Sequence, residues 1–167
     1  MSRIYAEHPS LQQIVAEINE SIKQEMAGRT FRAANELRNA SLQVLRGQRS
    51  GRRYKVPGTY ARQRDQTDGK MKNGRYYTAS APGEPPAVRS GMFRLSWQPN
   101  ARIEDGKYVA MVESDLQVGT HTKYLLGELL EDGTSRMAPR PHHERIQEQA
   151  APGIFRIYDE PYREEFR

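Results

Sequence analysis

Apolar side chains recur every three or four positions near the start of the chain, which is the spacing of one face of a helix. These apolar residues are Leu11, Ile14, Val15, Ile18, Ile22 and Met26. Ser10 precedes the first of them and is a favourable N-cap residue. We expect an amphipathic helix over residues 10–27, ended by Gly28, and a second helix over residues 31–45 that Thr30 caps.

A different pattern follows near the middle of the chain. Residues 95–103 and 107–113 are rich in strand-forming residues, and Asp105-Gly106 between them is typical of a tight hairpin turn. We expect two antiparallel strands here, a short turn capped by Ser90 before them, and a third strand over residues 116–120. Alternate positions of the second strand are apolar on both faces, which predicts a sheet covered on both sides.

The segment 133–141, with sequence GTSRMAPRP, joins two expected helices. Leucines in residues 124–130 have helical spacing, and Gly133 suits the left-handed end of a helix. Pro139 and Pro141 restrict the residues before them to extended geometry, and Pro141 can begin a new helix. We expect a rigid hinge that exposes Arg136 and Arg140. The second helix should end at Pro152-Gly153, with a short element at 154–158 and a tail at 161–167 in which Phe166 anchors on a partner.

Residues 47–84 form the least apolar stretch, with Val56 and Met71 as its larger aliphatic side chains. The formal charge of residues 46–76 is +8 within a chain of net charge +5. Tyrosines interleave with the basic residues, so a nucleic-acid-contacting arm is one interpretation, because arginine neutralises phosphate and tyrosine stacks on bases. The alternative is a long loop that orders against neighbouring subunits. The candidate DNA- or partner-contacting residues are Arg49, Arg52, Arg53, Arg62, Arg64, Lys70, Lys72 and Arg75.

Composition excludes several classes of protein. The chain has 167 residues, 36% of them hydrophobic, and no cysteine, so disulfides and thiolate metal sites are excluded. No apolar run reaches the roughly 18 residues of a membrane helix, and no signal peptide is recognisable. We therefore expect a protein assembled in the cytoplasm that does not enter the membrane.

Catalytic and metal chemistry have little support in the sequence. His121 and the pair His142-His143 invite a metal hypothesis, but adjacent histidines point in different directions on a helix and no partner stands at ligand spacing. Glu128, Glu131 and Asp132 are interpreted as an exposed acidic helix end. No nucleophile elbow or phosphate-binding glycine motif is present. We expect no enzyme activity, no cofactor and no metal.

Two stretches resemble the neck or tail-completion proteins of tailed bacteriophages. They are SAPGEPPAVRSGMFRLSW at residues 80–97 and GTSRMAPRP at residues 133–141, with Tyr124 between them in the order that the family shows. The similarity covers residues 80 to about 149. The chain departs from the family at His142-His143, where an aromatic–leucine pair is usual, and at Arg89, where an acidic residue is usual.

The resemblance implies an α+β fold in which a long helix packs on a small antiparallel sheet, here with an extra N-terminal amphipathic helix and a long basic loop. We divide the chain into N-terminal helices (1–46), a basic arm (47–84), a sheet with helices completing the core (85–151) and a C-terminal tail (152–167). The family implies a structural virion protein that forms a ring in the head-to-tail connector, or neck, around the DNA channel. Its partners would be copies of itself, portal, adaptor or head-closure proteins, and tail terminator or tail-tube proteins.

The expected subunit interface gathers around the hinge. It comprises Tyr124, Leu129, Gly133, Thr134, Ser135, Arg136, Met137, Pro139, Arg140 and Pro141. The alternative function is a nucleic-acid-binding module that uses residues 46–76 as an electrostatic tether.

Overall fold

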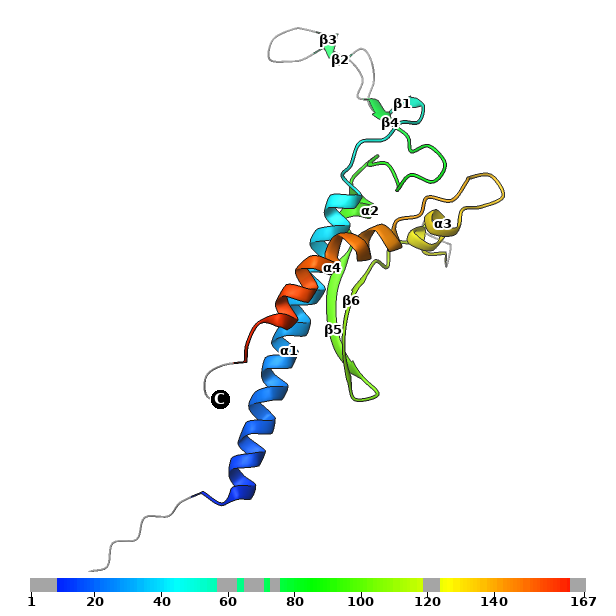
Figure 1. Ribbon diagram of the computed structural model, residues 1–167. Helices are drawn as coiled ribbons and strands as arrows, with labels where there is room; N and C mark the ends of the chain where they lie inside the picture. The colour runs from blue at the N-terminus through cyan, green and yellow to red at the C-terminus, as the bar shows by residue number, and fades with distance from the viewer. Residues whose placement is uncertain (1–8, 57–62, 65–70, 73–75, 119–123, 163–167) are drawn as a thin grey trace, which may run out of the picture.

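One long helix forms the spine of the molecule. The structure is a computed structural model that describes residues 9–56, 63–64, 71–72, 76–118 and 124–162. Helix α1 spans Leu11–Val44, and Ser10 and Gln13 form a capping box at its start. Helix α4 and the β5–β6 hairpin lie alongside α1, while its first turns extend beyond both (Figure 1).

The sequence-based prediction of two N-terminal helices is wrong, because α1 runs through Gly28 without a break. A glycine inside a helix costs only about 1 kcal/mol relative to alanine, which packing on both sides of it can offset. Thr30 does not cap a new helix. Its hydroxyl donates instead to the carbonyl oxygen of Met26 one turn earlier, at 2.7 Å.

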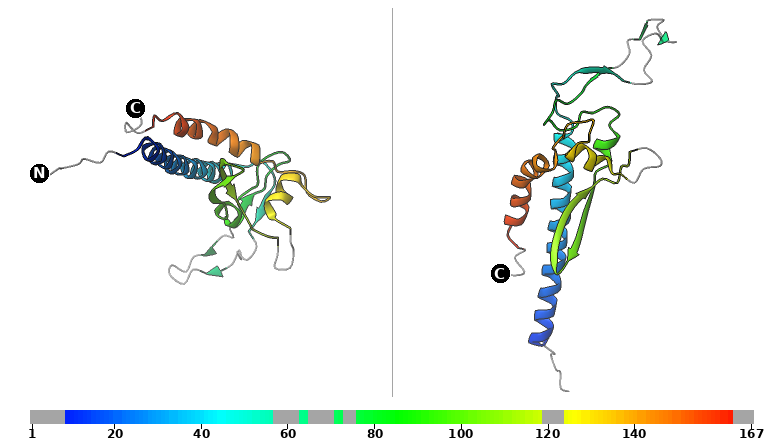
Figure 2. Two further views of the ribbon diagram at one scale, coloured as in Figure 1. Left: turned by 90° about the horizontal axis from the view of Figure 1, so that it is seen from below. Right: turned by 90° about the vertical axis from the view of Figure 1, so that its right-hand side faces the viewer.

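The expected hairpin is present. Strands β5 (Gln98–Glu104) and β6 (Lys107–Glu113) pair antiparallel, with Ala101 opposite Ala110. Asp105 and Gly106 form the turn, both with positive φ. The hairpin lies alongside α1, as two perpendicular views show (Figure 2), and the Tyr108 hydroxyl reaches the carbonyl oxygen of Lys23 at 3.4 Å.

Helix α4 (His143–Asp159) packs on another side of α1, and the two helices form a shared core. Ala40 of α1 contacts Ile146 and Ala150 of α4, and Leu37, Val44 and Ile154 pack against this cluster. Pro152 lies inside α4, so the predicted end at Pro152-Gly153 is wrong. Apolar residues on both sides of Pro152 pack against the rest of the protein, which offsets the hydrogen bond that proline cannot donate.

Short elements complete the fold. Helix α2 spans Met92–Leu95 and helix α3 spans Leu126–Asp132. The predicted third strand is reduced to one bridge, between Gln117 and Leu125, and part of it lies outside the described residues.

The arm predicted as a loop contains two strand pairs, which are β1 (Arg53–Lys55) with β4 (Tyr76–Thr78) and β2 (Gln63–Arg64) with β3 (Met71–Lys72). The chain is therefore an α+β protein, as predicted.

A buried arginine fastens the end of α4 to α1. The side chain of Arg29 is 2% exposed and forms a 2.6 Å ion pair with Glu25. It also donates to the carbonyl oxygens of Tyr158 and Pro161, and the ring of Tyr162 lies 4.4 Å from its guanidinium carbon. These contacts satisfy a charge that would otherwise be costly to bury.

Candidate functional site

The segment 133–141 is a closed turn attached at both ends. Gly133 adopts φ 78°, as its place at the end of α3 predicts. The backbone N–H groups of Thr134 and Met137 each donate to the other residue's carbonyl oxygen, at 2.8 and 3.2 Å. Arg140 N–H donates to Leu130 of α3 at 2.7 Å. The hinge expected from the sequence is therefore an ordered connection between α3 and α4.

Most of the residues predicted for a subunit interface lie in this turn, but they differ in solvent exposure. Tyr124 is 67% exposed and Arg136 is also exposed. Arg140, which we expected to be exposed, is half-buried, and its guanidinium donates to the carbonyl oxygens of Ser80 and Ala81. Arg140 therefore joins the hinge to the arm within one chain. Gly133, Thr134, Ser135, Met137, Pro139 and Pro141 form the turn itself, and Leu129 is half-buried in α3.

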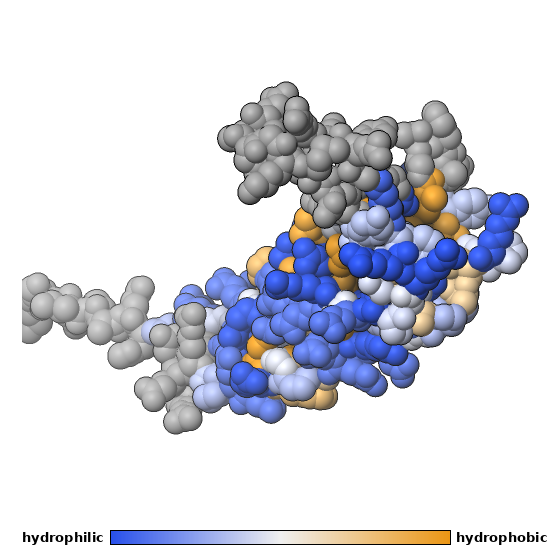
Figure 3. All heavy atoms as spheres, turned by 90° about the horizontal axis from the view of Figure 1, so that it is seen from above, coloured by the Kyte–Doolittle hydropathy of each residue, from blue (hydrophilic) through white to orange (hydrophobic). Residues whose placement is uncertain are grey.

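A groove of about 1050 Å³ lies between the hinge, α2, α3 and the base of the arm. Its apolar lining includes Phe93 of α2, Leu126 and Leu130 of α3, and Met137 of the hinge. Viewed from the arm end, apolar residues lie among hydrophilic ones on the surface of the described part of the chain (Figure 3). Of the expected interface residues, Met137 and Arg140 line the groove.

Arg49, predicted to contact DNA or a partner, instead closes the base of the arm. Its guanidinium donates to the carbonyl oxygens of Pro85 at 2.6 Å, Pro86 at 3.1 Å and Val44 at 2.8 Å. Burial lowers the pKa of Arg49, and the charge of Glu84 opposes this shift. A guanidinium with this many carbonyl partners is committed to the fold rather than to an external phosphate.

Glu84 forms the other half of this base. One carboxylate oxygen accepts from the Ser50 hydroxyl at 2.6 Å, and the other accepts from the backbone N–H groups of Ala81 at 2.8 Å and Ser50 at 3.1 Å. The Ser50 hydroxyl and these N–H groups lower the pKa of Glu84 from 4.5 to about 2. Together with Arg49, Glu84 holds the two ends of the arm side by side.

The β1–β4 pair carries basic residues that are exposed and can contact DNA or a partner. Residues 53–55 are all exposed. Arg53 and Lys55 share one face of β1, and the Arg53 guanidinium lies 4.7 Å from the ring of Tyr76. Tyr54 and Tyr77 face each other across the pair, with ring centroids 6.0 Å apart. We call residues 53–55 and 76–78 the basic ribbon. Arg52 precedes it, with its guanidinium 5.6 Å from the Tyr54 ring.

The other predicted arm residues are less fully described. Arg64 lies in β2 and Lys72 lies in β3, so their backbones belong to a strand pair. Arg62, Lys70 and Arg75 lie outside the described residues. Phe166, expected to anchor on a partner, also lies outside them.

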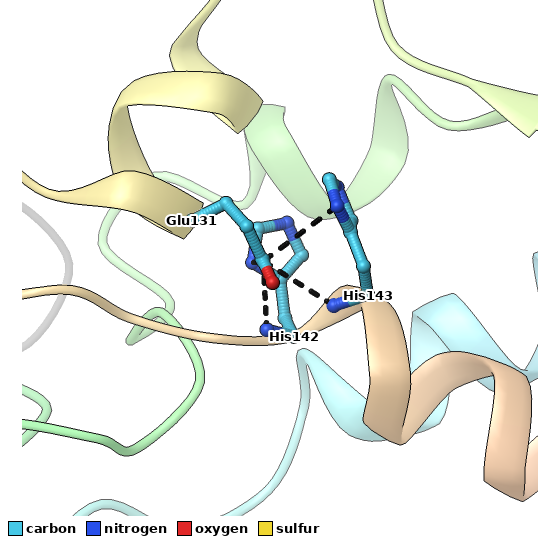
Figure 4. A group of neighbouring side chains, drawn as sticks. All are labelled: Glu131, His142 and His143. Carbon is cyan, nitrogen blue, oxygen red and sulfur yellow. Dashed lines mark hydrogen bonds and ion pairs between the residues drawn. The ribbon is translucent and has the colours of Figure 1, made fainter.

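A histidine–carboxylate cluster lies where α3 meets α4 (Figure 4). Glu131 is not a free acidic helix end, because its Oε2 accepts from the backbone N–H groups of His142 at 2.8 Å and His143 at 3.3 Å. The same oxygen lies 2.7 Å from Nδ1 of His142 and 3.8 Å from Nδ1 of His143. Glu131 thereby supplies the anion that the N-terminus of α4 favours.

His142 is fully buried, and its backbone is not helical (φ −141°, ψ −21°). The sequence-based argument against a metal site assumed that both histidines follow helical geometry. This backbone instead brings the two imidazole centroids to 4.6 Å. Burial lowers the pKa of His142, and the hydrogen bond to the Arg140 carbonyl opposes this shift. Phe93 and Trp97 pack edge-on against the ring.

Sequence reasoning missed the roles of Arg29, Arg49, Glu84 and Glu131. Many of their partners are backbone groups or residues up to 132 positions away, which no local spacing marks. The Arg29–Glu25 pair is the exception, because it has the i,i+4 spacing of a helical ion pair. Two of these roles had a signal in the sequence that could have been used. Glu131 lies beside a helix end, and Glu84 precedes a pair of prolines.

Comparisons with protein-family models, curated proteins and solved structures find no match for this chain. Within the described residues, no helix has the length and apolar character needed to cross a membrane.

Proposed function

We propose that this protein is a structural virion component that forms a homo-oligomeric ring in the neck of a tailed phage. The ring would join portal-side connector proteins to the tail around the DNA channel. The proposal combines the resemblance at residues 80–97 and 133–141 with the amount of apolar surface that one copy leaves uncovered.

The observation that carries the proposal is the free end of α1. Leu11, Ile14, Val15 and Ile18 lie on one face of its first turns, and all four are exposed, Leu11 by 81%. We call these four residues the α1 stripe. Neither α4 nor the hairpin extends along these first turns of α1 (Figure 2). An amphipathic helix that extends beyond its own core is stabilised when a partner covers its apolar face.

Other apolar side chains are also uncovered, and they lie on different elements. Met92 and Leu95 of α2 are more than half exposed, as is Phe155 of α4. Surfaces at separate places on one chain favour head-to-tail contacts between copies, and such contacts close into rings when the rotation between copies allows it. The groove beside the hinge is a further candidate contact surface in such a ring.

Gel filtration with light scattering, applied to matched substitutions, tests this proposal. Val15→Asp places a charge in the α1 stripe, whereas Ala16→Asp places the same charge on an exposed position away from it. We expect the unmodified protein and Ala16→Asp to form one large oligomer and Val15→Asp to dissociate. A monomeric unmodified protein, or equal masses for the two variants, would contradict the proposal.

The basic ribbon favours a second candidate function, which is a nucleic-acid-binding module. A two-stranded ribbon with exposed cations fits the major groove of duplex DNA. Arg53→Glu should weaken duplex binding and lower its salt dependence, because each phosphate contact adds about 0.9 to the slope of log K against log salt. Arg156→Glu on α4 is the control, since Arg156 is exposed and distant along the chain from the ribbon. Salt-sensitive DNA binding by a monomer would favour this function over the ring.

A further inference from the structure

We propose that Glu131, His142 and His143 form a binding site for a divalent transition-metal ion such as Zn²⁺. One ring nitrogen of each histidine and one carboxylate oxygen lie within 4.8 Å of one another. Two imidazoles and a carboxylate are a common set of protein ligands for zinc. This inference goes beyond the proposed ring and does not depend on it.

The protonation of His142 leaves one nitrogen free for a ligand. The neighbours of Nδ1 are both acceptors, namely Glu131 Oε2 at 2.7 Å and the Arg140 carbonyl oxygen at 3.0 Å. We therefore assign the ring hydrogen to Nδ1, which leaves the lone pair on Nε2. Histidines that bind metals are oriented in this way, with the second ring nitrogen donating to a group that is not itself a ligand of the metal. Here the Arg140 carbonyl oxygen takes that role, and the Glu131 carboxylate would turn from Nδ1 toward the ion.

Nε2 of His142 is the second observation that points to a ligand. It is buried and has no hydrogen-bond partner among the residues that the structure describes. A buried acceptor without a partner is destabilising, so native proteins normally satisfy such an atom. Trp97 Nε1, a donor on a ring 5.8 Å from His142, is likewise buried without a partner in the described part of the chain. A water molecule between the two rings is the competing explanation.

The site can contract around a metal ion without rebuilding the fold. Zinc ligands lie about 2.0–2.2 Å from the ion, so tetrahedral ligand atoms are separated by about 3.4 Å. The three candidate ligand atoms now lie within 4.8 Å of one another, and the side chain of His143 is 48% exposed, so it can turn toward the other two residues. The metal would then link the last turn of α3 directly to the start of α4 across the hinge.

Trp97 allows metal binding to be measured at the site itself. It is the only tryptophan of the chain, and its ring centroid lies 5.8 Å from that of His142 and 6.1 Å from that of His143. A bound paramagnetic Co²⁺ ion should quench tryptophan fluorescence at this range. We expect saturable quenching at one Co²⁺ per chain, reversed by excess Zn²⁺, and a higher melting temperature with Zn²⁺ because the ion binds the folded state.

Two variants test the ligands without threatening the fold. His143→Ala removes an exposed side chain, and Glu131→Gln keeps an amide oxygen that can still accept from the backbone of α4. Each should weaken Co²⁺ binding by tenfold or more, whereas the double substitution His8→Ala/His121→Ala, which removes the other two histidines of the chain, should not. Unchanged affinity in His143→Ala and Glu131→Gln would overturn the site, as would loss of binding in the control. Absence of saturable binding up to about 1 mM Co²⁺ would also overturn it and leave the bridging water as the explanation.

Discussion

The guanidinium of Arg49 donates a 2.6 Å hydrogen bond to the carbonyl oxygen of Pro85, joining residues 36 positions apart. Arg49 follows the end of α1, and Pro85 begins the path back to α2 and the sheet. This contact therefore sets where the arm leaves the body and where it returns. Arg49, one of the arginines in the most basic part of the sequence, thus serves the fold.

Substituting Arg49 by methionine should destabilise the protein. The change keeps a long side chain but removes the donors for the carbonyl oxygens of Val44, Pro85 and Pro86, the last two in buried residues. We expect a loss of about 1–3 kcal/mol in the free energy of unfolding, measured with urea. Arg53→Met on the exposed ribbon should change it by less than about 0.5 kcal/mol. Equal effects of the two substitutions would contradict the assigned role of Arg49.

Glu84 should make stability depend on pH in the acidic range. Its pKa is lowered from 4.5 to about 2, so its contribution is complete above pH 4.5 and is lost as pH falls through about 2. Glu84→Gln should therefore unfold at lower urea than the unmodified protein at neutral pH, and the difference should shrink between pH 4.5 and pH 2. Glu128→Gln removes the same charge from an exposed position of α3 and should have a smaller effect at neutral pH. A constant difference across this range would refute the assignment.

Two glycines should respond in opposite ways to alanine. A Cβ atom at Gly133 would lie 2.7 Å from the carbonyl oxygen of Met137, and its φ of 78° is unfavourable for alanine. Gly133→Ala should therefore destabilise the protein by more than about 1 kcal/mol. Gly28 lies inside α1 with nothing within 4 Å of an added Cβ, so Gly28→Ala should stabilise by about 0.5–1 kcal/mol. Thermal unfolding followed by circular dichroism measures both changes; stabilisation by Gly133→Ala would disprove the account of the hinge.

The sequence predicted elements wherever local rules decide the structure. The turn at Asp105-Gly106 and the positive φ of Gly133 both follow from the residue itself. Local rules failed at Gly28 and Pro152, where long-range packing keeps α1 and α4 continuous. Helix-breaking residues lower helix stability by limited amounts, and neighbouring apolar contacts can exceed them.

The candidate sites were harder to predict for the same reason. Glu131 and His142 are 11 positions apart and meet only because the hinge folds back between them. Arg140 has the charge expected of an interface residue, but its partners are carbonyl oxygens of its own chain. Charge is visible in a sequence, whereas the groups that satisfy it depend on the tertiary fold.

Electron microscopy of the purified full-length chain tests the central claim most directly. The claim is that copies of this protein cover the α1 stripe and the other exposed apolar side chains by closing around an axis. We predict annular particles with one subunit number and a central opening in the class averages. Isolated small particles of intact protein, without any annular class, would contradict the account.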